Sequence, residues 1–79
     1  MTHKYKVELQ REFRGHHVPV NRPEYLEVGA GTPDRTIIAK AKRLLGLSDY
    51  KSDKVENGDT IFLKLKGRKH HRLAIQFCS

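Results

Sequence analysis

The stretch TIFLKLKGRKHHRLAIQF, residues 60–77, decides the fold that this sequence predicts. Each of its two halves alternates between apolar and polar side chains, and a period of two is typical of a strand with one packed and one wet face. Gly67 opens a turn region between the halves, so the stretch predicts an antiparallel hairpin. The side chains expected to face inward are Ile61, Leu63, Leu65, Leu73, Ile75 and Phe77.

A helix is expected ahead of this hairpin, starting in the segment GAGTPD at residues 29–34. A threonine side chain can accept a free backbone N–H of the first turn, and proline suits the first helical position, so we expect Thr32 as N-cap and Pro33 after it. Gly46 is the expected end. The apolar side chains in between recur at helical spacing and form one stripe: Ile37, Ile38, Ala41, Leu44 and Leu45.

The N-terminal part of the chain predicts another strand over residues 4–14, where apolar and charged side chains alternate. The segment 15–23 contains two prolines and predicts a loop with at most a brief extended piece. The sequence permits a second short strand at residues 25–28, paired with the first or lying at an edge, and does not decide whether it forms. A weaker pattern at residues 51–55, before the turn signal Asn57-Gly58, permits one more strand.

These elements predict an α+β fold with a single compact domain over residues 1–79. The predicted sheet is small and antiparallel, with three to four strands in the chain order β(β)αββ. One amphipathic helix packs on one face of it, because the apolar stripe of the helix and the apolar face of the sheet must cover each other.

Positive charge is concentrated near the C-terminus. The formal net charge of the whole chain is +7, yet the last acidic residue is Asp59. The bases that follow it are Lys64, Lys66, Arg68, Lys69 and Arg72. Such a segregated patch attracts polyanions. If the helix covers one sheet face, Phe62 shares the opposite face with these cations, and the pair of features suits phosphates and stacked bases.

We therefore expect a non-enzymatic module that binds nucleic acid, RNA or DNA, or a nucleoprotein, without reading its sequence. The basic sheet face and the hairpin tip form the expected binding surface. Its candidate residues are Phe62, Lys64, Lys66, Arg68, Lys69 and Arg72, extended by Lys40 and Arg43 of the helix.

The two helix residues contribute if the helix and the hairpin contact a duplex together, mainly through phosphates. This arrangement loosely resembles a double-stranded-RNA-binding domain, in which helices pack on one face of an antiparallel sheet. That family ends in a long helix, whereas this chain is expected to end in a strand.

Two other function classes stay open. The first is a protein-interaction module that docks on an acidic protein surface, for example one encoded by a phage or mobile element that inhibits or modulates a host nucleic-acid machine. The second is a small ribonuclease toxin, in which His70 or His71 acts as general acid or base beside Arg68, Lys69 and Arg72. Steep weakening of binding by salt is expected for a nucleic-acid ligand and not for an apolar protein interface.

No cofactor and no metal are expected. Adjacent strand residues point to opposite faces, so His16-His17 and His70-His71 are poor ligand pairs. Cys78 is the single cysteine, which excludes an internal disulfide and a multi-cysteine metal site. The polar N-terminal segment and the lack of a long apolar run predict a cytoplasmic protein without a membrane span. Monomer and homodimer are both compatible with the sequence.

Overall fold

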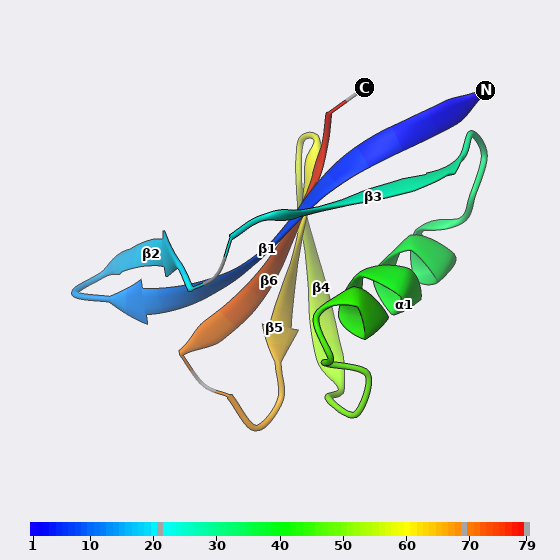
Figure 1. Ribbon diagram of the computed structural model, residues 1–79. Coiled ribbons are helices and arrows are strands. Elements are labelled where there is room, and N and C mark those ends of the chain that lie inside the picture. Colours follow the sequence, from blue (N-terminus) through cyan, green and yellow to red (C-terminus); the bar gives the residue numbers. More distant parts are fainter. Residues whose placement is uncertain (21, 69, 79) are drawn as a thin grey trace.

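The computed structural model describes residues 1–20, 22–68 and 70–78. Its elements are β1 (Thr2–Phe13), β2 (His16–Pro19), β3 (Glu24–Gly29), α1 (Asp34–Leu44), β4 (Ser52–Asn57), β5 (Thr60–Leu65) and β6 (His71–Phe77). The strands form one antiparallel sheet in the order β2-β1-β6-β5-β4, and β3 also pairs with β1. The helix α1 lies on one side of this sheet (Figure 1).

The sheet is larger than the sequence analysis predicts. Three to four strands in the order β(β)αββ were expected, whereas the described chain has six strands in the order βββαβββ. The two strands beyond the predicted count are β2, which falls in the predicted loop, and β4 (Ser52–Asn57), which covers the weak pattern at residues 51–55. The 12 residues of β1 offer one long edge to two short strands. Its first half pairs with β3, from Thr2 to Val7, and its last residues pair with β2, from Gln10 to Phe13.

The strand β2 falls in the segment that was expected to be a loop because of its prolines. Proline is tolerated there because β2 is an edge strand and Pro19 is its last residue. The strand that the sequence permits at residues 25–28 is present as β3, which pairs back on β1. Asn21, in the predicted loop, lies outside the described residues.

The C-terminal hairpin is confirmed. Strands β5 and β6 are antiparallel, with Leu63 opposite Leu73. Because β6 lies between β5 and β1, its inward side chains Leu73 and Ile75 are fully buried. Phe77 was also expected to face inward, but it is exposed near the end of β6, where its ring lies edge-on to that of Tyr5.

The helix packs on the sheet through Ile37 and Ala41, which are both buried. Leu44 was expected in the same stripe, yet as the last helical residue it is 43% exposed. Leu47 folds back after Gly46: its N–H donates to the carbonyl of Lys42 at 2.7 Å, and its side chain is buried. No helix within the described part of the chain has the length and apolarity to cross a membrane.

The start of α1 differs from the prediction. Thr32 is not the N-cap, because its hydroxyl donates to the carbonyl of Gly29 at 2.6 Å and so tightens the turn after β3. Pro33 takes the N-cap position without a side-chain hydrogen bond, and its carbonyl accepts the amides of Thr36 and Ile37. Asp34 then places a negative charge at the positive end of the helix dipole.

Candidate ligand-binding face of the sheet

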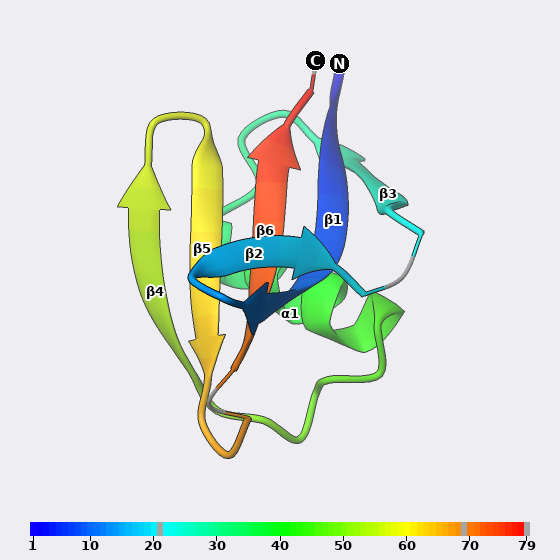
Figure 2. The same cartoon turned by 90° about the vertical axis from the view of Figure 1, so that its left-hand side faces the viewer.

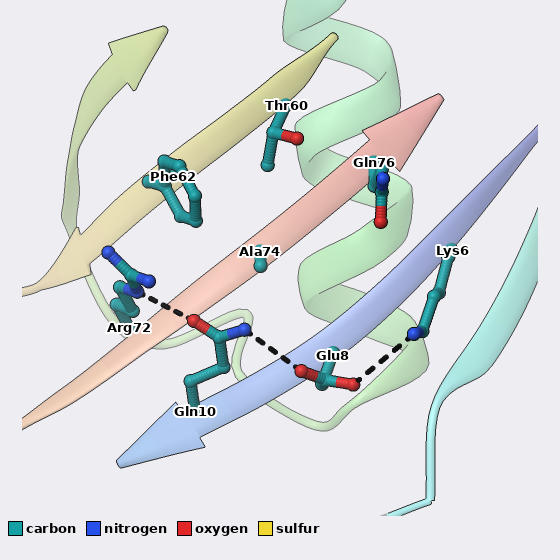
Figure 3. Close-up of a pocket in the computed structure, with 8 residues that line it drawn as sticks. All are labelled: Lys6, Glu8, Gln10, Thr60, Phe62, Arg72, Ala74 and Gln76. Atoms are coloured by element: carbon teal, nitrogen blue, oxygen red, sulfur yellow. Dashed lines mark hydrogen bonds and ion pairs between the residues drawn. The ribbon is translucent and has the colours of Figure 1, made fainter. Parts of the chain in front are cut away.

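One face of the sheet is left uncovered by α1, and we call it the outer face. Alternation along the strands brings polar side chains there from three neighbouring strands (Figure 3). The residues that line its shallow hollow of about 150 Å³ are Lys6, Glu8 and Gln10 of β1, Thr60 and Phe62 of β5, and Arg72, Ala74 and Gln76 of β6. The prediction that Phe62 and Arg72 share a face away from the helix is therefore confirmed.

A row of side-chain contacts crosses the outer face from β5 to β1 (Figure 3). The guanidinium carbon of Arg72 lies 4.0 Å from the centroid of the Phe62 ring. The Nε of Arg72 donates to Gln10 Oε1 at 2.7 Å, and Gln10 Nε2 donates to Glu8 Oε1 at 2.9 Å. The other carboxylate oxygen of Glu8 is 3.7 Å from Lys6 Nζ. Arg72 is thus held by a ring on one side and by an amide on the other.

Beside this row the outer face deepens into a second, larger cavity of about 370 Å³, which we call the hairpin groove. The hairpin β1–β2 arches over the outer face, on the side of the sheet away from α1 (Figures 1 and 2). The groove lies between this hairpin and the hairpin β5–β6. Its lining residues are Glu12, His17, Val55, Phe62, Lys64, Leu65, Arg68, His70, His71 and Arg72.

The lining of the hairpin groove combines positive charge with apolar surface. Lys64, Arg68 and Arg72 are cations, three further lining residues are histidines, and the one carboxylate among the described lining residues is that of Glu12. Val55, Phe62 and Leu65 supply the apolar part. A concave surface with a few cations beside an apolar wall suits an anionic ligand that carries an apolar or aromatic group.

Burial lowers the pKa of His71, and the nearby cations Arg68 and Arg11 and the imidazole of His70 lower that pKa further. Near pH 7 the His71 side chain is therefore mainly neutral. An anion bound beside it would favour the protonated form and oppose this effect. Burial also lowers the pKa of Arg72, but a guanidinium remains charged at any physiological pH.

The structure brings Phe62, Lys64, Arg68 and Arg72 together around the hairpin groove. Lys66, the next candidate, follows the end of β5, and its Nζ lies 3.8 Å from Asp53 Oδ1. Its charge is therefore partly compensated. Lys69 lies outside the described residues.

The two helix candidates are not part of this face. Lys40 and Arg43 belong to α1, which lies behind the sheet when the outer face is viewed (Figure 2). The sheet separates them from Phe62 and Arg72. They do not extend the hairpin groove.

Glu12 and His17 line the groove, although the sequence analysis did not select them. They lie directly opposite each other in the ladder between β1 and β2. The alternation over residues 4–14 already places Glu12 on the same face as Lys6, but His17 belongs to a segment predicted as a loop. The turn glycine Gly15 between two extended segments is the signal that would have indicated a hairpin here.

Comparison with known proteins gives no match to a family model, to a curated protein or to a solved structure. Within residues 1–20, 22–68 and 70–78, no three side chains of His, Cys, Asp or Glu are grouped so as to hold a metal ion. The function is therefore argued from the geometry and charge of the hairpin groove.

Proposed function

We propose that this protein is a non-enzymatic module that binds single-stranded nucleic acid in the hairpin groove. The observation that supports the proposal is the lining of the groove, where Lys64, Arg68 and Arg72 share one concave surface with the aromatic ring of Phe62. Lysine and arginine neutralise phosphates and so release the counterions condensed on the nucleic acid. An aromatic ring or a guanidinium plane stacks on a base of any sequence.

The size of the groove favours a single strand. A cavity of about 370 Å³ is in the range of small-molecule sites, so it accommodates about one nucleotide at a time. The arching hairpin β1–β2 limits access from above the sheet (Figure 2). The bases of a single strand are exposed and can enter such a groove, whereas those of a duplex are already stacked and paired.

The cations of the groove are free to contact phosphates. None of the ion pairs formed by described residues involves Lys64, Arg68 or Arg72. The guanidinium of Arg68 lies 5.6 Å from the centroid of the Tyr50 ring, which positions it at the turn between β5 and β6. Lys64 lies opposite Arg72 in the ladder of the same hairpin.

A salt series with two charge-matched variants tests the proposal. The groove variant carries Lys64→Gln and Arg68→Gln, and the control carries Arg35→Gln and Lys42→Gln on α1, so both lose the same charge. Fluorescence anisotropy with a short labelled oligonucleotide measures the dissociation constant between low and high salt. Each lost phosphate contact lowers the slope of log affinity against log salt by about 0.7 for a single strand, so we expect a slope shallower by roughly 1.4 for the groove variant alone.

Two results would contradict the proposal. One is that the wild-type protein does not bind the oligonucleotide even at low salt. The other is that both variants lose the same affinity, because binding would then depend on the total charge and not on the hairpin groove.

Protein binding is a second candidate function, and one observation favours it. Phe13, Val18 and Val20 are 57%, 41% and 45% exposed. Phe13 ends the inward-facing row of β1, and Val18 and Val20 lie across the β1–β2 hairpin from Arg11 and Leu9. Exposed apolar groups that lie together favour a protein interface. If this stripe binds a protein, the captured partner will survive nuclease and high salt and will be lost in the double variant Val18→Ser, Val20→Ser.

A further inference from the structure

We propose that Arg72, stacked on Phe62 and oriented by Gln10, is a preassembled platform on which a base of the bound strand stacks. This inference rests on the proposed function, because it specifies how one nucleotide is held in the hairpin groove. It also names the ligand class more narrowly, as a strand whose bases are unpaired and accessible.

The position of Arg72 supports a stacking role. Arg72 and Phe62 line both the hairpin groove and the shallower hollow next to it, so the pair forms the boundary between the two. The Phe62 ring covers the guanidinium from one side, at 4.0 Å from the guanidinium carbon. A guanidinium is planar, and nucleic-acid bases stack on such planes. We place the base on the face of this plane that Phe62 does not cover.

The orientation of this plane is fixed before any ligand arrives. The Nε of Arg72 donates to Gln10 Oε1 at 2.7 Å, and Gln10 is held in turn by Glu8 at 2.9 Å (Figure 3). An arginine that is already ordered loses less side-chain entropy on binding than a free one does. Its terminal nitrogens form no hydrogen bond with the described side chains, so they remain available as donors to the ligand.

The strand register places the other groups that a nucleotide needs around this pair. Val55 lies opposite Phe62 in the ladder between β4 and β5 and extends the apolar surface next to that ring. Lys64 lies opposite Arg72 in the ladder between β5 and β6, and Arg68 follows in the turn. In this proposal the base lies on the guanidinium face of Arg72 that Phe62 does not cover, and the phosphate lies toward Lys64 and Arg68.

The test compares two ligands that have the same phosphates. One is a short oligodeoxythymidine, and the other is the same backbone with abasic residues in place of the nucleotides. Stacking contributes to binding of the first ligand alone, so we expect the wild-type protein to bind it at least about five-fold more tightly. The variant Arg72→Lys keeps the charge and loses the plane. Whatever its affinity for the abasic strand, it should lose most of the wild-type preference for the strand that carries bases.

Two further variants sharpen the comparison. Gln10→Leu removes the acceptor that orients Arg72, so it should reduce the preference for bases. It removes no positive charge. Arg35→Lys on α1 is the matched control, and it should keep the full preference. Circular dichroism of each variant establishes that its sheet is intact.

The outcomes separate this inference from the proposed function. If the wild-type protein binds both strands equally, or if Arg72→Lys retains the preference, the stacking platform is wrong although nucleic-acid binding stands. If the wild-type protein binds neither strand, both proposals are wrong.

Discussion

The backbone N–H of Glu12 donates to the carbonyl oxygen of His70 at 2.7 Å and so joins the far end of β1 to the start of β6. This bond ties together the two hairpins that enclose the groove. It also places the Glu12 side chain at a wall whose other charged members are cations. A carboxylate in that position repels any polyanion that enters the hairpin groove.

Neutralising this carboxylate should therefore strengthen binding. We expect Glu12→Gln to raise the affinity for an oligonucleotide at low salt by up to about five-fold, which is the size of a single exposed charge interaction. The difference should shrink as salt screens the charges. Glu24→Gln on β3 changes the net charge equally and is the control in the same anisotropy measurement. Weaker binding by Glu12→Gln would show that this carboxylate contacts the ligand favourably.

Two apolar residues of α1 that look equivalent in the sequence should differ in their contribution to stability. Ile37 is 2% exposed and contacts the sheet, whereas Leu44 is 43% exposed at the helix end. We expect Ile37→Ala to lower the free energy of unfolding by about 2–5 kcal/mol and Leu44→Ala by less than about 1 kcal/mol. Urea denaturation followed by circular dichroism measures both. If Ile37→Ala does not fold, Ile37→Val should still cost about 0.5–1.5 kcal/mol.

Local patterns were sufficient where a feature depends on neighbours in the sequence. The hairpin over residues 60–77 follows from two alternating segments and one turn glycine, because its first strand pairs with the next strand along the chain. The same alternation placed Phe62, Lys64 and Arg72 on one face, because strand period alone decides which side chains point together. For the helix, equal losses in the Ile37 and Leu44 variants would contradict the packing of α1 on the sheet through Ile37.

The features that sequence analysis missed depend on pairing across the chain. The number of strands was underestimated because β2 contains prolines and β4 alternates only weakly, and a single sequence does not show the sheet edges on which they pair. The groove itself requires the β1–β2 hairpin to arch toward the outer face, which brings His17 near a turn that lies far from it in the sequence. The hydroxyl of Thr32 donates to the carbonyl of Gly29 instead of accepting an amide of α1.

The turn between β1 and β2 contains a strained residue, and a substitution can relieve this strain. Arg14 has φ of 52° and Gly15 has φ of 81°, a pair of left-handed residues as in a type I′ turn. A side chain such as arginine is disfavoured in that region by roughly 1 kcal/mol or more, whereas asparagine tolerates it.

We therefore expect Arg14→Asn to raise the free energy of unfolding by about 0.5–1 kcal/mol, measured as an upward shift of the thermal midpoint. Gly15→Ala is the opposing variant. Its added methyl group meets no atom within 4 Å, so any loss of stability comes from the backbone alone. A lower midpoint for Arg14→Asn would show that the arginine side chain itself stabilises the hairpin.

The folded protein disfavours protonation of His71, because burial, Arg68, Arg11 and His70 all lower its pKa below the ordinary value of 6.5. Above pH 6.5 the imidazole is neutral in both states and this contribution to stability is complete. As the pH falls below 6.5, the unfolded chain takes up the proton first, so the free energy of unfolding decreases. The neighbouring Glu12 on the groove wall acts in the opposite direction, and the cations outnumber it.

Stability should thus fall more steeply between pH 7 and 5 in the wild-type protein than in His71→Gln, when urea denaturation is measured at intervals of pH. His16→Gln on the exposed strand β2 is the control and should follow the wild-type curve. The effect of pH on ligand stabilisation should run the other way, because phosphates favour protonated imidazoles. The rise in thermal midpoint caused by the oligonucleotide should therefore grow as the pH decreases. A ligand-induced rise that stays constant from pH 8 to pH 5.5 would mean that no anion lies beside His71, which would remove the phosphate from this part of the hairpin groove.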